Sequence, residues 1–163
     1  MTTSNANTRV AIRSATPADR DFLAALANRL ADFDRPAWRS HEDIADGDRR
    51  ALFDALDHPQ QGTELFIAEL DGERAGCLLM WTLEDYFSQQ WHAHVSVIAV
   101  TKKAEGAGVG RALMAHAEAW ARARGHTSIT LSVFEGNRRA QALYERVGYT
   151  TEMRRMIKRL QAP

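Results

Sequence analysis

Five short runs of the chain are rich in apolar residues and are separated by polar or helix-like segments, and this pattern predicts β-strands. The runs are residues 10–14, 64–70, 75–81, 91–100 and 127–134, and residues from Tyr149 onward predict one or two closing strands. Asp71-Gly72 lies between the second and third runs. This dipeptide is typical of a tight hairpin, so we expect these two strands to pair antiparallel.

Four other segments carry apolar residues at helical spacing. They predict helices at about residues 17–30, 42–56, 111–124 and 137–147. Thr16 followed by Pro17 favours the start of the first helix, and Asn137 can cap the last. Gly125 and Gly148 follow the third and fourth helices, where a glycine is typical of a helix end.

The order of elements is strand, two helices, three strands, helix, strand, helix and closing strands. A run of antiparallel strands followed by a strand-loop-helix-strand unit predicts a mixed sheet with helices, of the α+β class. The 163 residues suit one domain at roughly 150 residues per domain. Residues 1–8 are small and polar, so we expect a disordered tail there and a single domain over residues 9–163.

Composition narrows the range of partners. Lysine plus arginine and aspartate plus glutamate each total 21, so the formal net charge is zero, which argues against a general nucleic-acid binder. No apolar run approaches about 18 residues, so no membrane span is expected. The first residues lack the features of a signal peptide, so we expect a cytoplasmic location. The single cysteine, Cys77, excludes an internal disulfide and is expected to be a buried small apolar residue.

A glycine-rich loop joins the end of a predicted strand to the start of a predicted helix, and it contains Gly106, Gly108 and Gly110. Glycines let the backbone turn tightly, and the free N–H groups of the next helical turn then form an anion site suited to a pyrophosphate. No Gly-Lys-Ser/Thr follows, and the glycines are not spaced as in G-x-G-x-x-G. Taken alone, this loop also fits a purely structural turn.

A second motif is Asn137-Arg-Arg-Ala-Gln-Ala-Leu-Tyr-Glu-Arg-Val-Gly-Tyr149. Together the two motifs resemble the GNAT superfamily of acyl-CoA-dependent N-acetyltransferases, whose signatures are Arg/Gln-x-x-Gly-x-Gly/Ala and Asn-x-x-Ala-x-x-Leu-Tyr-x-x-x-Gly-Phe/Tyr. The resemblance is strongest over residues 91–150. It departs at Glu105, where the family usually has Arg or Gln, and a carboxylate near phosphates is repulsive. Basic residues that could offset this charge are Lys102, Lys103, Arg111, Arg138 and Arg139.

The resemblance implies a GNAT-like three-layer fold, in which helices flank a mostly antiparallel, twisted central sheet. It also implies acetyl-CoA as the cosubstrate. The end of the predicted strand 91–100 would run beside the pantetheine arm, and the loop and the following helix would hold the pyrophosphate. The cofactor-binding residues that the resemblance implies are Ile98, Ala99, Val100, Glu105, Gly106, Ala107, Gly108, Val109, Gly110, Arg111 and Asn137.

Two residues are candidates for catalysis. The resemblance places Tyr144 near the sulfur, where its hydroxyl can donate a proton to the leaving thiolate, although simple packing is the alternative. GNAT enzymes often place a Glu on the strand at the position that His94 occupies here. An imidazole accepts a proton at neutral pH, so His94 is expected as the base or as part of a water relay. Its side chain shares a strand face with Ser96 and Ile98 if no bulge intervenes.

Other candidates for the base are His92, Glu84 and Asp85, and a water chain without a dedicated base is a further possibility. His92 and His94 also have the spacing of two metal ligands on one strand face. No third ligand lies near them in the sequence, so no metal site is expected.

Acceptor binding is expected from the first helical pair and from the loop before residues 91–100. Both regions combine carboxylates with aromatic rings, which suits a cationic amine, although an acidic rim over a hydrophobic interface fits equally well. The candidate residues are Phe33, Trp38, Glu84 and Tyr86. The resemblance also implies a homodimer, whose interface could contain these aromatic residues.

The sequence therefore predicts an N-acetyltransferase that moves an acetyl group from acetyl-CoA to a primary amine, most simply of a small molecule, by direct attack in a ternary complex. A catalytically silent acyl-CoA-binding sensor or scaffold is a second hypothesis, which Glu105 and the missing strand Glu favour. Transfer to protein amino groups, or to those of charged RNA, is a third. No other nucleic-acid partner and no membrane partner is expected.

Overall fold

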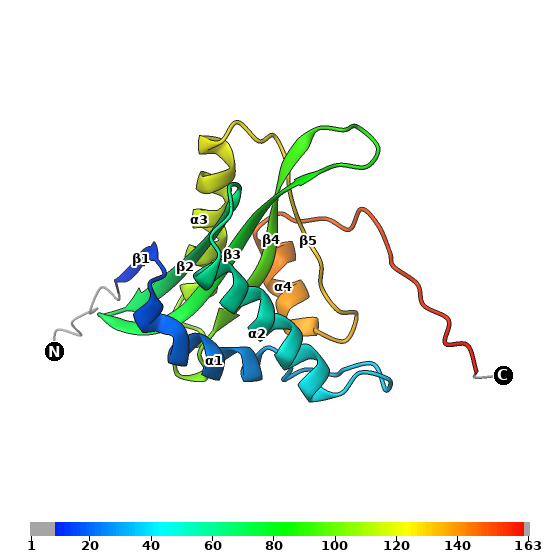
Figure 1. Ribbon diagram of the computed structural model, residues 1–163, viewed down its shortest axis with the longest axis horizontal. Helices are drawn as coiled ribbons and strands as arrows, with labels where there is room; N and C mark the ends of the chain where they lie inside the picture. Colours follow the sequence, from blue (N-terminus) through cyan, green and yellow to red (C-terminus); the bar gives the residue numbers. More distant parts are fainter. Residues whose placement is uncertain (1–8, 162–163) are drawn as a thin grey trace, which may run out of the picture.

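The computed structural model describes residues 9–161, which form one central sheet with helices packed on it (Figure 1). The tail predicted at residues 1–8 lies outside the described residues. Within residues 9–161, no helix combines the length and the apolar character that crossing a membrane requires.

The sheet has five strands in the order β1-β2-β3-β4-β5. The strands are β1 (Val10–Ser14), β2 (Thr63–Leu70), β3 (Glu73–Glu84), β4 (Trp91–Val100) and β5 (Ile129–Leu131). The first four pair antiparallel in chain order, and β5 pairs parallel to β4. The mixed, mostly antiparallel sheet expected from the sequence is thereby confirmed.

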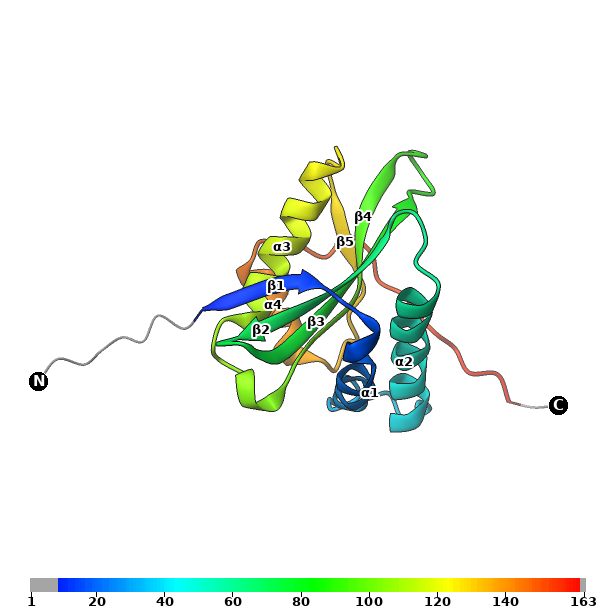
Figure 2. The same cartoon turned by 60° about the vertical axis from the view of Figure 1, so that its left-hand side comes forward.

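Two pairs of helices cover the two faces of the sheet (Figure 2). The helices are α1 (Arg20–Arg29), α2 (His41–Asp57), α3 (Val109–Ala123) and α4 (Arg138–Arg146). Leu26 of α1 and Leu52 of α2 belong to the core on one face. Leu113 of α3 and Tyr144 of α4 belong to the core on the other. The predicted three-layer arrangement is therefore confirmed, and we call the two sides the α1–α2 face and the α3–α4 face.

Local signals in the sequence set the ends of several elements. Asp71 and Gly72 both take positive φ angles, 52° and 85°, in the β2–β3 turn, as a two-residue hairpin requires. Ser40 caps α2, because its hydroxyl accepts a hydrogen bond from the Asp43 N–H at 3.0 Å and the Asp43 carboxylate accepts one from the Ser40 N–H at 2.9 Å. This capping box starts α2 at His41, one residue before the predicted start.

A β-bulge interrupts the pairing of β3 with β4. Leu79 pairs with Val97, but the next residue, Met80, pairs with Val95, which leaves Ser96 without a partner on β3. The extra residue exchanges the two faces of β4. Val95 belongs to the core of the α3–α4 face and Val97 to that of the α1–α2 face, although both are odd-numbered.

The exchange of faces overturns one expectation from the sequence. His94 was expected on the same face as Ser96 and Ile98 in the absence of a bulge. Instead, the ring of His94 stacks on Trp81, which packs against the core of the α1–α2 face. Ile98 packs on the α3–α4 face. The two side chains therefore lie on opposite faces of the sheet, because one residue of bulge reverses the alternation.

The closing strands predicted after Tyr149 are wrong for the described residues, because residues 149–161 contain no strand. This segment runs away from the body of the domain (Figure 1). Its apolar side chains are spaced by three, one and three residues, so no face of an extended strand would collect them. These exposed side chains are Met153, Met156, Ile157 and Leu160.

Candidate active site

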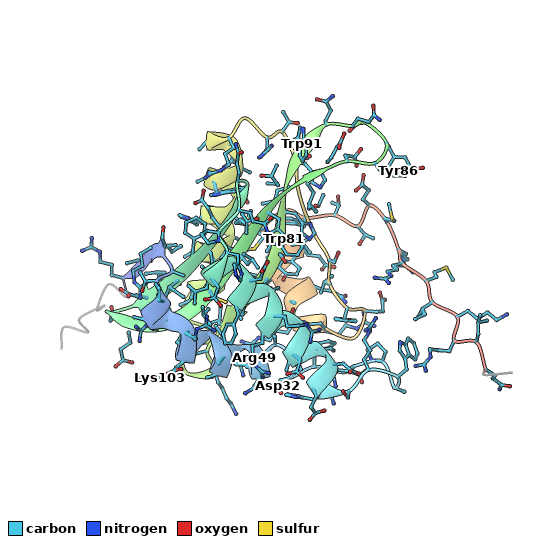
Figure 3. All side chains as sticks on the ribbon, viewed as in Figure 1. Asp32, Arg49, Trp81, Tyr86, Trp91 and Lys103 are labelled. Atoms are coloured by element: carbon cyan, nitrogen blue, oxygen red, sulfur yellow. The ribbon has the colours of Figure 1, made fainter. Side chains whose placement is uncertain are left out.

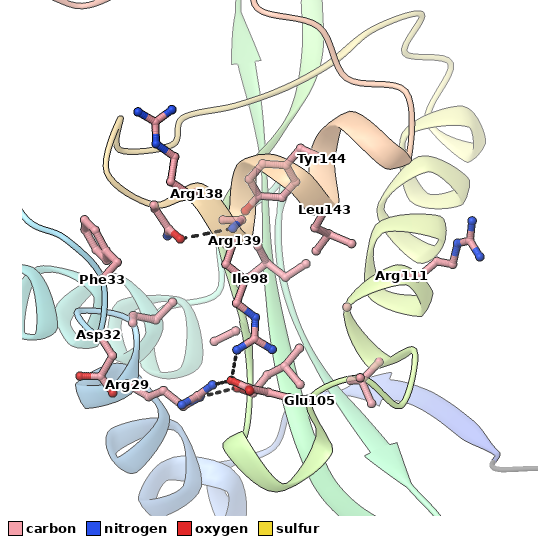
Figure 4. Close-up of a pocket in the computed structure, with 18 of the residues that line it drawn as sticks. Arg29, Asp32, Phe33, Ile98, Glu105, Arg111, Arg138, Arg139, Leu143 and Tyr144 are labelled. Carbon is pink, nitrogen blue, oxygen red and sulfur yellow. Dashed lines mark hydrogen bonds and ion pairs between the residues drawn. The ribbon is translucent and has the colours of Figure 1, made fainter.

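A cavity of about 690 Å³ lies between β4, the glycine-rich loop and helices α3 and α4, with the end of α1 on one side (Figure 4). It forms because β5 pairs with β4 over only three residues, ending at Val95 and Leu131. From Ser96 to Val100 the second edge of β4 has no strand partner among the described residues. Backbone groups on this edge can therefore pair with an extended ligand.

The glycine-rich loop borders the cavity, and the space beside two of its glycines is open. Gly106 and Gly108 have φ angles of 77° and 84°, and no atom lies within 4 Å of where their Cβ atoms would stand. Gly108 is the N-cap of α3, and the first helical bond of α3 runs from the Ala112 N–H to the Gly108 carbonyl. The N–H groups before Ala112 are thus free of helical partners, and together with the helix dipole they favour an anion.

Helix α4 supplies the tyrosine predicted from the sequence. The side-chain oxygen of Asn137 caps this helix by accepting a hydrogen bond from the Ala140 N–H at 3.3 Å. Two turns further on, Tyr144 lines the cavity and is only 9% exposed. Burial raises the pKa of the Tyr144 hydroxyl to about 12. The phenol therefore keeps its proton at neutral pH and can donate it inside the cavity.

Three charged side chains meet in the cavity. Arg29 from the end of α1 and Arg139 from the first turn of α4 both form ion pairs with the same carboxylate oxygen of Glu105 in the loop (Figure 4). Arg29 also donates a hydrogen bond from Nε to the carbonyl oxygen of Val100, at 2.8 Å, and so contacts β4. We call these three residues the Arg29–Glu105–Arg139 cluster. The cluster connects α1, the glycine-rich loop and α4.

His94, the predicted base, does not line the cavity. Its Nδ1 lies 2.8 Å from the hydroxyl oxygen of Thr130 on β5, and Nε2 of His92 lies 3.1 Å from that same oxygen. Burial, and secondarily the charge of His92, lower the pKa of His94, so its imidazole is neutral at physiological pH. His94 lies next to Val95, the last β4 residue that pairs with β5.

Most residues that the resemblance implied for the cofactor surround this one cavity. Every one of them lines it except Ala107. Of the acceptor candidates, only Phe33 lines it, and its ring stacks on Phe134 at 5.1 Å between centroids. Trp38, Glu84 and Tyr86 are not lining residues. Tyr86 lies at the outer end of the β3–β4 hairpin, away from Asp32 (Figure 3).

Sequence reasoning missed one functional residue of the cavity above all, Arg29 at the end of α1. Arg29 occupies the last turn of a helix whose pattern indicated only packing, and nothing in the motif around Glu105 points to it. Among the described residues, no group of three His, Cys, Asp or Glu side chains is arranged to hold a metal ion.

Comparisons with known proteins agree with this geometry. Residues 24–149 match the model of the acetyltransferase (GNAT) family. Mycothiol acetyltransferase from Streptomyces avermitilis is 29% identical to this chain over 144 residues, which are 87% of this chain and 43% of that protein. The chain thus spans less than half the length of this relative.

Solved structures share the fold. A ribosomal-protein-alanine N-acetyltransferase from Brucella melitensis superposes with a TM-score of 0.68 at 18% identity, covering 93% of this chain and 100% of that one. An aminoglycoside N-acetyltransferase in complex with CoA gives a TM-score of 0.68 at 16% identity, covering 95% and 97%. The family model covers well over half of the chain, and the chain therefore belongs to the GNAT acetyltransferase family.

Proposed function

We propose that this protein transfers an acetyl group from acetyl-CoA to a primary amine of a small molecule, by direct attack in a ternary complex. The observation that carries the proposal is that one cavity brings together the open edge of β4, the N-terminus of α3 and the hydroxyl-bearing ring of Tyr144. These are an edge for an extended amide-containing chain, a site for phosphate and a proton donor.

The residues present fit acetyl-CoA. The open edge of β4 over residues 96–100 offers backbone partners to the amides of the pantetheine arm. The loop glycines and the first turn of α3 offer N–H groups to the pyrophosphate, and Asn137 borders the same space. When bound there, acetyl-CoA supplies an activated acetyl thioester.

In this proposal the side chains of the protein move two protons, and its backbone orients the thioester. The amine nitrogen bonds to the acetyl carbon as the carbon–sulfur bond breaks, and the thiolate that leaves takes a proton from Tyr144. The proton that the amine loses passes through water to His94, since His94 holds a neutral imidazole and lies beside the point where β4 and β5 separate. A backbone N–H on β4 polarises the thioester carbonyl.

The acceptor is a cationic amine in this proposal. Asp32 and Phe33 stand together at the α1 end of the cavity, and a carboxylate beside an aromatic ring binds an ammonium group by charge pairing and cation–π contact. Among proteins of similar fold, one is named for aminoglycosides and another for the alanine of a ribosomal protein. Both kinds of acceptor therefore belong in an acceptor screen.

We also propose a cytoplasmic homodimer. The cytoplasmic location rests on the proposed use of acetyl-CoA, an intracellular metabolite. The dimer is supported by apolar side chains that the single chain leaves exposed, at the tip of the β3–β4 hairpin and in the C-terminal segment. Examples are Phe87, which is 77% exposed, and Met156, which is 92% exposed. Sedimentation of the purified protein at several concentrations tests it.

A second candidate function is a silent acyl-CoA-binding protein. The observation that favours it is the Glu105 carboxylate, which lies in the loop that would hold the phosphates. Such a protein would bind the cofactor without turnover, and it would use the same cavity.

Calorimetric titration with acetyl-CoA, followed by a thiol-release assay over a panel of amines, tests the proposal. The panel includes an aminoglycoside, a polyamine, amino acids and a peptide with a free N-terminus. Binding with release of CoA in the presence of a small amine supports the transferase, and release only with the peptide replaces the small-molecule acceptor by a protein. Binding without release for any amine favours the silent protein. Absence of binding at millimolar acetyl-CoA contradicts both.

A further inference from the structure

The Arg29–Glu105–Arg139 cluster is assembled from three distant parts of the chain. The Glu105 carboxylate faces one guanidinium from the end of α1 and one from the first turn of α4. The Glu105 and Arg29 side chains are only about a quarter exposed, at 24% and 26%, while Arg139 is 66% exposed. Two arginines around one carboxylate leave the cluster with one net positive charge.

The other arginines near the cavity do not join this cluster. Figure 4 shows Arg111 and Arg138 pointing outward, whereas Arg29 and Arg139 converge on Glu105. A guanidinium presents its N–H groups in a planar fork that matches a carboxylate and a phosphate equally well. The Glu105 carboxylate thus lies between two guanidinium groups. The same arrangement of guanidinium groups suits a phosphate oxygen.

We propose that Arg29 and Arg139 are a phosphate clamp for the cofactor and that Glu105 is an internal competitor that holds the clamp occupied in the free protein. The inference rests on the proposed use of acetyl-CoA. Cofactor phosphates displace the Glu105 carboxylate, which moves toward solvent, and the two guanidinium groups bind the phosphate oxygens instead. Breaking the two ion pairs of Glu105 costs free energy, and this cost weakens the binding of the cofactor.

The displacement also affects the pantetheine site. Arg29 donates a hydrogen bond from Nε to the carbonyl oxygen of Val100, so the side chain that holds Glu105 also contacts β4 near the end of its open edge. When Arg29 moves onto a phosphate, this carbonyl becomes available to an amide N–H of the pantetheine arm. Phosphate binding and arm binding are therefore coupled through one side chain in this proposal.

The test compares calorimetric titrations of wild type, Glu105→Gln and Glu105→Ala with CoA and, separately, with inorganic pyrophosphate. Removing the internal carboxylate is expected to tighten both ligands, by about tenfold for one lost competing ion-pair contact. Glu73→Gln is the matched control, because it removes the same charge from an exposed pair with Lys103 that does not line the cavity. We expect it to change either affinity by no more than about twofold, the size of a screened surface effect.

A second comparison assigns the gain to the arginines. In the Glu105→Gln background, Arg139→Gln or Arg29→Gln is expected to abolish the tenfold gain for both ligands. Arg138→Gln, which removes a neighbouring charge outside the cluster, is expected to preserve it. Equal losses from Arg138→Gln and Arg139→Gln would overturn the clamp, since a diffuse positive field would then explain the binding.

The outcomes separate this inference from the proposed function. Wild type that binds CoA, with Glu105 variants that bind it no better or more weakly, would overturn the competitor and leave the transferase proposal intact. If neither wild type nor any variant binds CoA, the proposed function fails. The titrations with inorganic pyrophosphate alone then test the phosphate clamp. Tighter pyrophosphate binding by Glu105→Gln than by wild type then supports it, and unchanged or absent pyrophosphate binding overturns it. Circular dichroism of each variant confirms that the fold is retained.

Discussion

Nδ1 of His94 lies 2.8 Å from the hydroxyl oxygen of Thr130, and this contact ties β4 to β5 beside the point where the two strands separate. Because no described residue makes a hydrogen bond with Nε2 of His94, the imidazole can accept a proton there while Thr130 fixes its orientation. His94 does not line the cavity, and the first β4 residue that does is Ile98. A water molecule between His94 and the amine would complete a relay.

His94→Gln is expected to lower kcat/KM about 100-fold, within the usual range for the loss of a general base. In the wild type, kcat/KM should fall as pH drops through the pKa of His94, which lies below its ordinary value near 6.5. The variant should lack this acidic limb. Rates measured from pH 5 to 9 check it, and an acidic limb that persists in the variant would assign the proton acceptor elsewhere.

His92→Gln is the matched control for His94. The charge of His92 is the second cause that lowers the pKa of His94, after burial. Removing His92 should therefore shift the acidic limb to higher pH while leaving the plateau rate within about threefold. A plateau loss as large as that of His94→Gln would indicate that both rings, or His92 alone, carry the proton.

Tyr144→Phe is expected to lower kcat by about 10- to 100-fold while CoA affinity stays within about twofold, because only the proton donor is lost and the ring is kept. The burial that raises the pKa of this hydroxyl to about 12 keeps it protonated across the assay range. Single-turnover rates and CoA titrations of the same sample check the two parts. An unchanged kcat would leave Tyr144 as a packing residue.

Tyr149→Phe controls for the loss of a phenol in the same region. The Tyr149 hydroxyl is buried and has no hydrogen-bond partner within residues 9–161, and the Tyr149 ring lies 6.0 Å from that of Tyr144. Its removal should leave kcat unchanged and raise the free energy of unfolding by up to about 1 kcal/mol, because an unpaired buried hydroxyl is costly. A fall in kcat equal to that of Tyr144→Phe would mean that repacking of α4 causes both effects.

Much of the fold follows from local patterns that the chain carries openly. Asp71-Gly72 requires a hairpin, Asn137 caps α4, and the alternation over residues 91–100 indicates β4 with its observed bounds. The glycine loop before a helix also indicated an anion site, although only the second motif, from Asn137 to Tyr149, separated this hypothesis from a structural turn. Each of these depends on residues close together in the sequence.

The bulge at Ser96 could not be read in the same way. Residues 91–100 contain no glycine or proline, and half-buried and buried residues alternate from His92 to Val100 on both sides of the bulge. The reversal is visible only in which core each residue joins, and that depends on packing with α1 and α3. Arg29 was missed for a related reason: its pairing with Glu105 depends on how α1 docks against β4, which no local pattern encodes.

Asp48→Asn is expected to stabilise the protein at neutral pH. Asp48 lies on α2 between buried Ala45 and Leu52 on the same helical face, and burial raises its pKa to about 6. A carboxyl group whose pKa is raised by folding costs nothing while protonated in both states, below about pH 4, and destabilises the fold increasingly as pH rises to about 6. Because water still reaches this half-buried group, we expect a gain of about 1–2 kcal/mol at pH 7.

Urea unfolding of wild type and Asp48→Asn at pH 4, 5, 6 and 7 checks the size and the direction of this effect. The difference between them should grow with pH over this range. Asp46→Asn is the control, since Asp46 is half exposed and paired with Arg49, and it should change the unfolding free energy by less than about 0.5 kcal/mol. A stability difference for Asp48→Asn that does not vary with pH would show that burial of its charge is not the cause.

Asp19→Asn tests the one fully buried carboxylate described in the structure. Asp19 accepts hydrogen bonds from Arg13 at 2.8 and 2.9 Å, from Arg74 at 2.7 Å and from the Thr16 N–H at 2.8 Å. The hydrogen bonds from Arg13 hold the pKa of Asp19 well below its usual range, against the effect of burial. A carboxyl whose folded pKa is depressed stabilises the fold above its unfolded pKa near 4, and that contribution is lost as pH falls.

Asp19→Asn should therefore cost about 3 kcal/mol at pH 7, and the cost should shrink toward pH 2 in urea unfolding experiments. Asp21→Asn, at an exposed position in the first turn of α1, should cost less than about 0.5 kcal/mol. A deficit for Asp19→Asn that stays constant from pH 7 to pH 2 would assign the loss to altered packing, and the ionic contacts to Arg13 and Arg74 would then not be what stabilises this corner of the sheet.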